Sequence, residues 1–539
     1  MASLARATAL MSFGTVLSRV TGLIRLAALV AALGVAESRL PDAYNLANTA
    51  PNIIYELVLG GILTSVFVPV FVELLENEGR ERAWEVASAV INLVLVVLMV
   101  VAALGILAAP AIARFYTLTL EGSTAEIQRN VLTFLLRLFI PQIVFYGLAA
   151  VTAGLLNAHK RFGPPMYTPV LNNLAVIAVF VAFHAAYPSD VTLSSVTDRQ
   201  LLIVGLGTTA GVALMAFAQL PFLRGLGRYR LTLSLRHPSV RKLARLSVFV
   251  IGYVIVNQIG YLIVQVLAND QQGGYSAYIA AFTFFMLPHG LFAVSVTTAL
   301  LPGMSEHAVH ARWDGFKERL STGVRATILL VLPAAIGYFT LSREIVRLLL
   351  ERGIFSEAST DLVAAVLRFF VLGLVPFSLF QLFLRAFYAL QDTRTPFLIN
   401  CGAVAVNIAI NIPLYFVLGV SGLAAGHATA YALGLFLQVR SLRKRIGPLG
   451  GAEIGRSALR IGGAGAVMAG VVAGTIRLTD AVVPTDNAFG QLVALVGAVV
   501  IGAASYLVAA RAFGVTELAM ARGIVGRRVG GKSASNEEL

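Results

Sequence analysis

Apolar runs of about 20 residues recur along the whole of this 539-residue chain, and they constrain its fold more than any other feature. A run of that length spans the hydrocarbon core of a bilayer as an α-helix. Mean hydropathy is +0.82 and only 13% of residues are charged, whereas a soluble domain has roughly 25%. We therefore predict an all-α integral membrane protein with about fourteen transmembrane helices. The expected spans lie near residues 10–33, 42–75, 84–112, 130–157, 166–187, 200–223, 243–268, 275–303, 319–341, 361–390, 395–418, 421–439, 457–478 and 487–511.

The basic residues that give the chain its net charge of +14 gather in the even-numbered connections between these spans. The sixth carries Arg224, Arg228, Arg230, Arg236, Arg241, Lys242 and Arg245, and the twelfth carries Arg440, Arg443, Lys444, Arg445, Arg456 and Arg460. The seventh, eleventh and thirteenth have no Lys or Arg. Excess Lys and Arg marks cytoplasmic loops, so we expect both termini in the cytoplasm. The charge thus indicates topology and no nucleic-acid partner.

The first twelve spans contain an internal repeat. Three pairs of prolines are separated by offsets of 233 to 237 residues: Pro51 and Pro288, Pro69 and Pro302, Pro141 and Pro376. Each half has six spans, an even number, so the two copies have the same orientation, as in transporters with parallel repeats. We predict a first repeat in 1–230, a second in 231–445, two extra transmembrane helices in 446–515 and a polar tail in 516–539.

No motif of an enzyme stands out. The chain has one cysteine, Cys401, which excludes disulfides and a cysteine metal cluster. There is no P-loop, no His-Glu metal motif and no nucleophile triad. We therefore expect a transporter with no catalytic residue, no metal site and no bound cofactor. The ninth connection contains SREIVRLLLERG, which is typical of an amphipathic helix on the outer membrane surface.

Two arginines, Arg19 and Arg25, interrupt the first apolar span. An arginine near the bilayer centre costs about 2.5–3.5 kcal/mol on insertion scales, so neither is expected to face lipid. Ser18 lies seven residues before Arg25 and shares its helix face. The functional interpretation is an anion site, since a guanidinium suits phosphate. The alternative is pairing with an acid or with helix carbonyls, or snorkelling to the interface.

The second span has a polar stripe, formed by Asp42, Asn45, Asn48, Asn52 and Glu56. These residues fall on one helix face if the helix is regular, and a kink at Pro51 would divide the stripe in two. Inside a membrane such a face lines water or protein. Lining of a cavity is favoured because Asp42 and Glu56 are acids, and hydrogen bonding between helices is the alternative.

A second polar set suggests a cation site. It consists of Asn257 in the seventh span, Asn407 and Asn411 in the eleventh, and Thr429 in the twelfth. Their oxygens suit a hard cation. None is charged, so packing of helices is the favoured interpretation of these four. His289, beside Pro288, is interpreted as a packed or hydrogen-bonded histidine.

Several segments resemble the MurJ (MviN) family of the multidrug/oligosaccharidyl-lipid/polysaccharide exporter superfamily. They are SRVTGLIR at 18–25, DAYNLANTAPNIIYELVLGGILTSVFVPVF at 42–71, GLLNAHKRFGPPMYTPVLNN at 154–173, MLPHGLFAVSVTTALLPGMSE at 286–306 and ALQDTRTPF at 389–397. The resemblance covers roughly residues 5–512. It implies a lipid II flippase of the bacterial cytoplasmic membrane, with a cationic central cavity and a groove for the polyprenyl tail at the last two helices. Lipid II would move to the outer leaflet by alternating access.

The resemblance also implies a set of residues for the diphosphate cavity. It assigns Arg19, Arg25 and Asp42 to that cavity, and Ser18, Asn52 and Glu56 complete the predicted set. Two positions depart from the family, because Tyr55 and Thr283 stand where arginines are frequent. The cavity is therefore expected to be less basic than in other members.

The driving force is less well defined by the resemblance. Some members bind sodium where Asn407 and Asn411 lie, but here the site is without carboxylates. The driving force therefore stays open between a Na⁺ or H⁺ gradient and the membrane potential. The expected partners are lipid II, membrane lipids and cell-wall synthesis proteins.

Other functions remain open at this point. One is export of another polyprenyl-linked saccharide, or drug/ion antiport within the same superfamily, although a drug exporter favours an acidic, aromatic cavity. Another is a membrane-bound glycosyl- or acyltransferase, for which no acid or histidine constellation stands out. A third is a membrane scaffold for cell-wall enzymes, in which Arg19 and Arg25 would be an unexplained cost.

Overall fold

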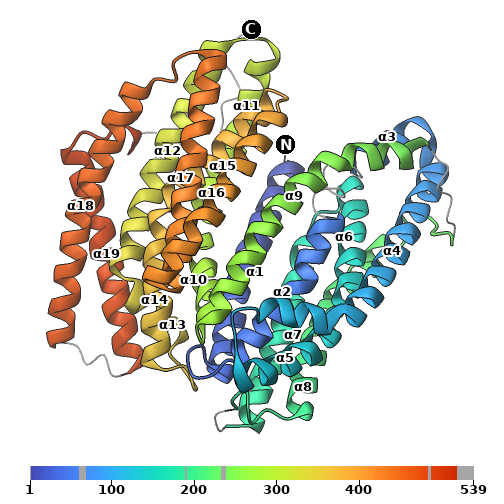
Figure 1. Cartoon of the computed structure of the whole chain (residues 1–539). Helices are drawn as coiled ribbons and strands as arrows, with labels where there is room; N and C mark the ends of the chain where they lie inside the picture. The colour runs from blue at the N-terminus through green and yellow to red at the C-terminus, as the bar shows by residue number, and fades with distance from the viewer. Residues whose placement is uncertain (1, 60–67, 189–190, 232–237, 483–486, 519–539) are drawn as a thin grey trace. The chain divides into compact units, whose positions relative to one another are not determined.

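The computed structural model describes residues 2–59, 68–188, 191–231, 238–482 and 487–518, and every regular element in these ranges is a helix (Figure 1). A polypeptide in a bilayer forms helices because no water is present to satisfy its amide groups. The first part of the chain forms α1 (Ala2–Leu33), α2 (Leu40–Leu59), α3 (Val68–Asn77), α4 (Gly79–Tyr116), α5 (Gly122–Phe139), α6 (Gln142–Ala158), α7 (Gly163–Ala186), α8 (Asp198–Phe217), the short η2 (Leu220–Leu223) and α9 (Pro238–Asp270). The rest forms α10 (Gly274–Pro288), the π-helical turn η3 (His289–Ala293), α11 (Val294–Val309), α12 (Trp313–Thr340), α13 (Ser342–Leu350), α14 (Glu357–Leu372), α15 (Leu374–Ala389), α16 (Arg394–Leu418), α17 (Val420–Ile446), α18 (Gly451–Val482) and α19 (Ala488–Ala512).

The helices confirm the predicted all-α membrane fold. Eleven helical segments in the described ranges are long and apolar enough to cross a membrane, and a twelfth arises if α14 and α15, bent by 46° at their junction, form one span. The described part of each of the fourteen expected spans falls on helices, so fourteen is consistent with the structure without being confirmed. The second and seventh expected spans account for the difference between twelve spans and fourteen. Residues 60–67 of the second lie outside the described residues, and the apolar part of the seventh is the shorter Val254–Asp270.

One segment of the predicted internal repeat can be compared at its helix boundaries. The proline offset of 235 brings Gly122, the first residue of α5, onto Glu357, the first residue of α14. Both copies also interrupt their helix near its middle, close to Pro141 between α5 and α6 and at Gly373 between α14 and α15. With the same offset the two breaks lie within three residues of each other, which agrees with a repeat over this segment, and the full extent of the repeat stays a prediction.

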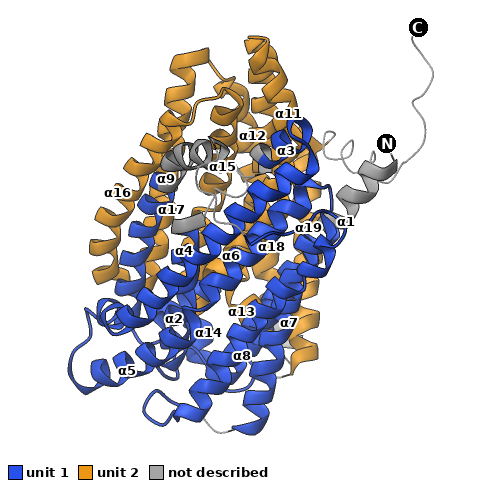
Figure 2. Cartoon of the chain, turned by 90° about the vertical axis from the view of Figure 1, so that its right-hand side faces the viewer, with its two compact units in different colours: residues 1–280, 349–362 blue, residues 281–348, 363–539 orange. Residues whose placement is uncertain are grey.

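The helices group into two compact units, which Figure 2 colours separately. Unit 1 comprises residues 1–280 and 349–362, and unit 2 comprises residues 281–348 and 363–539. Unit 1 extends beyond the predicted repeat boundary near residue 230, because it also contains α9 and the start of α10. A compact unit and a sequence repeat are different divisions of the chain, so the repeat boundary stays a prediction. Of the predicted polar tail, residues 519–539 lie outside the described residues.

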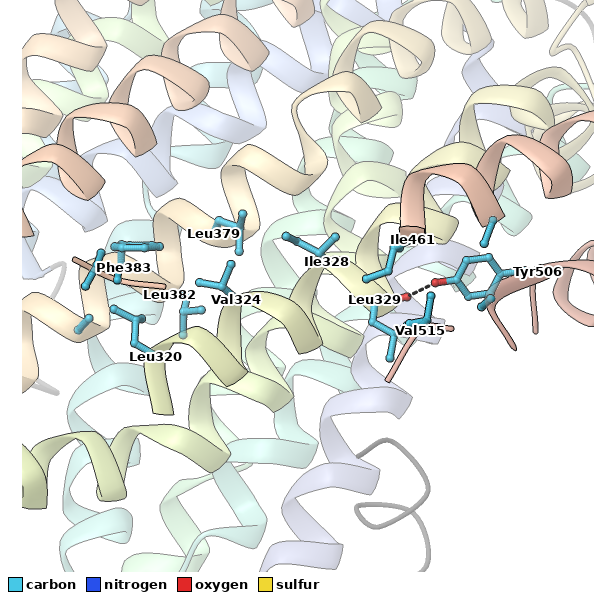
Figure 3. Packing of buried hydrophobic residues seen from close by; sticks show 14 of the residues in the cluster. Leu320, Val324, Ile328, Leu329, Leu379, Leu382, Phe383, Ile461, Tyr506 and Val515 are labelled. Atoms are coloured by element: carbon cyan, nitrogen blue, oxygen red, sulfur yellow. Dashed lines mark hydrogen bonds between the residues drawn. The ribbon is translucent and has the colours of Figure 1, made fainter. Parts of the chain in front are cut away.

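Unit 2 has a continuous apolar core to which the last two helices contribute (Figure 3). Ile328 and Leu329 of α12 are buried there together with Ile461 of α18 and Tyr506 of α19. The Tyr506 hydroxyl donates a 3.0 Å hydrogen bond to the carbonyl oxygen of Leu329. A buried hydroxyl needs such a partner, so this bond fixes the position of α19 along α12.

Candidate functional site

The arginine-bearing helix α1 packs along α7 in unit 1. The Asn173 amide of α7 donates to the Thr21 hydroxyl at 3.0 Å and to the Ser18 carbonyl oxygen at 3.2 Å. These bonds orient α1 so that Thr21 is buried against α7, while Arg19 is exposed and Arg25 is half-buried. Ser18, half-buried itself, contributes its backbone to this contact.

Neither the Arg19 nor the Arg25 guanidinium has a hydrogen bond or an ion pair in the part of the chain that the structure describes. The charge of Arg25 instead acts on the hydroxyl groups of two tyrosines, Tyr44 of α2 and Tyr146 of α6. An arginine inside a membrane protein that has no acid to neutralise it is suited to a mobile anion.

The polar residues of α2 form one stripe, because the helix continues through Pro51 without interruption. The two ends of the stripe differ in their surroundings. Asp42 and Asn45, near the start, are buried, whereas Asn52 and Glu56, near the end, are exposed. The structure thus supports hydrogen bonding between helices at the start of the stripe, and the lining of a cavity by its end stays a prediction.

The exposed end of the stripe lies beside a tyrosine of α6. Asn52 hydrogen-bonds to the Tyr146 hydroxyl. The Tyr55 ring lies against the Tyr146 ring, with 5.7 Å between the centroids. Arg25 lies within electrostatic range of the Tyr146 hydroxyl, to which Asn52 is bonded. Of the predicted residues, Arg25 and Asn52 thus share one neighbour, Tyr146, which was not among those predicted.

The buried start of the stripe holds the α9–α10 turn. The Asp42 carboxylate accepts hydrogen bonds from the Gly273 amide at 2.7 Å, the Ser276 amide at 2.9 Å and the Ser276 hydroxyl at 2.8 Å. A carboxylate at the first turn of α10 interacts favourably with the helix dipole. Asn45 donates to the same Ser276 hydroxyl at 3.0 Å. The geometry thus gives Asp42 a structural role, and its contact with substrate stays a prediction.

The α1–α2 connection next to Asp42 also holds the end of α9. Arg39 donates to the carbonyl oxygens of Asn269 and Asp270, both at 2.7 Å. The last carbonyl groups of a helix have no partner within the helix. Arg39 supplies that partner and so caps α9.

Glu37 of the same connection holds the start of α14. Its carboxylate accepts hydrogen bonds from the Ser356 amide and the Ser359 hydroxyl, both at 2.7 Å. Burial alone would raise the pKa of Glu37, but these hydrogen bonds outweigh it and hold the pKa below the usual value of 4.5. The carboxylate is therefore ionised at neutral pH.

The candidate cation residues occur without a carboxylate among them. In unit 2 the Asn411 amide donates to the Asn407 carbonyl oxygen at 3.0 Å, and Asn411 is buried. The Thr429 hydroxyl donates back to the Ala425 carbonyl oxygen at 2.9 Å. Asn257, in unit 1, is half-buried. Among the described residues no three His, Cys, Asp or Glu side chains group as metal ligands, so a cation there would rest on neutral oxygens.

Sequence reasoning missed the two tyrosines near Arg25. Tyr44 shares a 2.7 Å hydrogen bond with the Thr208 hydroxyl, and its ring packs edge-on against two phenylalanines. Tyr146 lies in an apolar run in which Gln142 alone is a polar neighbour at helical spacing. Periodicity therefore gives no signal for Tyr146, and proximity to Arg25 is needed to find it.

His289 agrees with its interpretation as a packed, hydrogen-bonded histidine. It is buried in unit 2, and its Nδ1 atom shares a 3.0 Å hydrogen bond with the Ser378 hydroxyl. Its ring lies against Phe377, with 4.7 Å between the centroids. The residue therefore belongs to the packing of unit 2.

Comparison with known proteins gives a consistent result. The family model described as lipid II flippase MurJ matches residues 29–492. A probable lipid II flippase MurJ from Rhizobium meliloti is 30% identical over 429 residues, which cover 79% of this chain and 78% of that protein. A lipid II flippase MurJ from Burkholderia cenocepacia is 29% identical over 454 residues, covering 82% and 84%.

Solved structures show the same fold. A lipid II flippase MurJ in an inward closed conformation superposes with a TM-score of 0.74 at 23% identity, covering 94% of this chain and 98% of that one. An inward-facing multidrug resistance transporter of the MATE family and the MOP superfamily has a TM-score of 0.64 at 14% identity, covering 80% and 95%. At these identities the likeness concerns the fold alone.

Proposed function

This chain belongs to the lipid II flippase family MurJ, and from this premise we propose that it moves lipid II from the inner to the outer leaflet of the cytoplasmic membrane. Lipid II is the undecaprenyl-diphosphate-linked precursor of peptidoglycan, so the role is transport in cell-wall synthesis. The fold is that of a multi-pass inner-membrane transporter. Alternating access is the mode of movement expected for parallel repeats.

The single observation that carries the proposal at the level of residues is the environment of Arg25. It has no bonded partner among the described residues, and its charge reaches Tyr146, which hydrogen-bonds to Asn52. A diphosphate presents oxygens that a planar guanidinium binds through paired hydrogen bonds. The tyrosine hydroxyl and the asparagine amide are suited to phosphate or sugar oxygens. Arg19, exposed on another face of α1, extends the positive charge. A scaffold gains nothing from such uncompensated charge.

The main experiment follows lipid II by leaflet. Cells depleted of this protein and complemented with it are labelled with a reagent that reaches only externally exposed lipid II. We expect external lipid II to fall on depletion and to return on complementation. Unchanged external labelling after complete depletion would refute the assignment. Restoration of another polyprenyl-linked saccharide instead would identify the exporter alternative.

The side of the termini, the partners and the driving force are further parts of the proposal. Basic residues in the even-numbered connections support cytoplasmic termini. Membrane lipids and cell-wall synthesis proteins remain proposed partners beside lipid II. The four candidate cation residues are neutral, which favours coupling to the membrane potential over binding of sodium. Replacing Na⁺ by K⁺ during a flipping assay is then expected to leave the flipping rate unchanged. Loss of activity would instead support sodium binding at these four residues.

A further inference from the structure

A pocket in unit 2, remote in the chain from the α1 and α2 residues above, lies between α13 and the helices α18 and α19. Its polar lining consists of Arg343, Glu344 and Arg347 of α13 and Gln491 of α19, and Ile476 of α18 and Leu495 of α19 are among its apolar walls. Arg343 and Arg347 are four residues apart, so they share one face of α13. The pocket therefore combines two positive charges with an apolar side.

Glu344 gives a second, independent indication of a ligand. Within the part of the chain that the structure describes it makes no hydrogen bond or ion pair, and its Oε2 atom is buried. A buried polar oxygen without a donor is costly and calls for a partner. Glu344 also lines the pocket, so a carboxylate without a protein partner stands at the pocket wall, where a ligand cation can pair with it.

The location of the pocket indicates what kind of molecule reaches it. Gln491 lies in the first turn of α19 and Ile476 lies about two turns before the end of α18, so the pocket is at the turn between these two membrane helices. Charged and apolar residues alternate along α13, as in helices that lie at the membrane surface. Further along α19 an apolar strip is exposed, formed by Leu492, Val496 and Val499. A ligand with a charged head and hydrocarbon chains fits both parts.

We propose that this pocket binds the headgroup of a membrane phospholipid of the ethanolamine type. Arg343 and Arg347 hold the phosphodiester, since arginine is suited to phosphate. The ammonium group donates to the Glu344 carboxylate, and the acyl chains lie along the exposed strip of α19. An ethanolamine head is favoured over a glycerol head because an ammonium group offers both hydrogen-bond donors and a charge opposite to that of Glu344. Binding there would hold α13 against α18 and α19.

The test measures binding of defined lipids to the purified full-length protein by native mass spectrometry, together with thermal stability in detergent. The probes are phosphatidylethanolamine, phosphatidylglycerol and phosphatidylcholine with identical acyl chains. Phosphatidylethanolamine is expected to bind best and to raise Tm most. Phosphatidylcholine, which has no N–H donor, is expected to bind less. Equal binding and equal stabilisation by all three lipids would overturn the proposal.

Variants assign the effect to the pocket. R347Q and R343Q should each weaken phosphatidylethanolamine binding roughly tenfold, the equivalent of about 1.4 kcal/mol for a lost charge-assisted contact. E344Q should remove the preference for ethanolamine over glycerol while leaving binding of phosphate. R477Q is the matched control, because Arg477 is exposed on α18 next to Ile476 but does not line the pocket. An equal loss in R477Q would show a general charge effect and refute the site.

Two further arms separate the head from the tails and folding from binding. Glycerophosphoethanolamine, which has no acyl chains, should compete at high concentration if the headgroup is recognised, and complete failure to compete would leave only chain packing and contradict the proposal. If R347Q does not fold, R347K keeps the charge but not the planar fork and should bind with intermediate strength. These readouts involve no transport, so they succeed or fail independently of the flippase assignment.

Discussion

Arg25 and Asp42 both lie in unit 1 and carry opposite charges, yet their surroundings differ. Arg25 has no bonded partner among the described residues, whereas Asp42 accepts three hydrogen bonds. Removing an unpaired charge from a membrane helix relieves a cost of insertion. Removing a saturated carboxylate leaves buried amides without an acceptor. The two substitutions should therefore separate loss of function from loss of fold.

We expect Arg25→Ala, and also Arg19→Ala, to abolish complementation while the protein stays in the membrane at near-normal level. Arg25→Lys keeps the charge but loses the planar guanidinium fork, so this variant should flip lipid II less well than the unsubstituted protein. The measurements are growth of depleted cells and the amount of protein in the membrane by immunoblot. Normal growth of both alanine variants would show that the arginines are structural and that the anion site is wrong.

Asp42→Ala is the contrasting control. The Gly273 and Ser276 amides would lose their acceptor, at about 1–3 kcal/mol for each unsatisfied group. The level of folded protein and its Tm in detergent should both fall. If the level stays normal and only flipping is lost, Asp42 contacts the substrate as the sequence analysis predicted, and its bonding to α10 is secondary.

At the scale of elements, the α1–α2 connection joins three helices through side chains that are close in sequence. Arg39 caps the end of α9, Asp42 caps the start of α10, and Glu37 lies at the start of α14. Gly34, at a left-handed φ of 74°, ends α1 and turns the chain into this connection. An L-residue at this φ is strained, and a Cβ there would also collide with the Glu37 carboxylate. The short segment therefore fixes three helix ends of unit 1 at once.

The Glu37 contact predicts a dependence of stability on pH. The pKa of Glu37 is lowered from 4.5 in the folded protein. Its ionised form thus stabilises the fold fully above about 4.5, and this contribution is lost as the pH falls through the lowered pKa. Glu37→Gln should lower Tm at pH 7, by the equivalent of about 1–2 kcal/mol, and by progressively less as the pH is taken below 4.5. Thermal unfolding of both proteins in detergent across this range checks it, and a constant difference would exclude Glu37 as the cause.

Hydropathy and the proline offset predicted the elements well because both depend on local sequence. Spans such as α4 and α16 follow directly from apolar length, and the break between α14 and α15 matches the one between α5 and α6. The hydrogen bond between Asp42 and Ser276 could not be predicted, because the two residues are 234 positions apart and no local sequence pattern pairs one with the other. For the same reason the candidate site was predicted only in part. Arg25 and Asn52 were found from their polarity, and Tyr146 was not.

At the scale of the whole molecule, contacts between connections test the parity of the span count. Arg39 of the first connection bonds to Asn269 at the seventh, and Asn269 bonds to Tyr116 at the third. Glu37 of the first connection bonds to Ser356 of the ninth. All four of these connections are odd-numbered, so they belong on one side of the membrane.

The even-numbered connections contact one another in the same way. Arg161 of the fourth bonds to Phe222 near the sixth, and Arg445 of the twelfth bonds to Asp392 of the tenth. A miscounted span would place an odd and an even connection in contact somewhere in this set. These contacts, each within one unit, show no such mixture, which supports the grouping that a count of fourteen requires. Which group faces the cytoplasm rests on charge, because the even-numbered connections carry the basic residues.

Thiol labelling tests the orientation directly. Cys401 is first replaced by alanine, and single cysteines are then placed at Ser195 in the fifth connection, where the residue is exposed, and at Ser239 in the sixth. We expect an impermeant thiol reagent to label Ser195→Cys in intact cells, and to label Ser239→Cys only after permeabilisation. The energetic reason is that moving the seven basic residues of the sixth connection across the bilayer is strongly unfavourable. The reverse pattern would place both termini and the even-numbered connections outside the cell. Lipid II carried outward would then have to enter from the side of the odd-numbered connections, which contact one another.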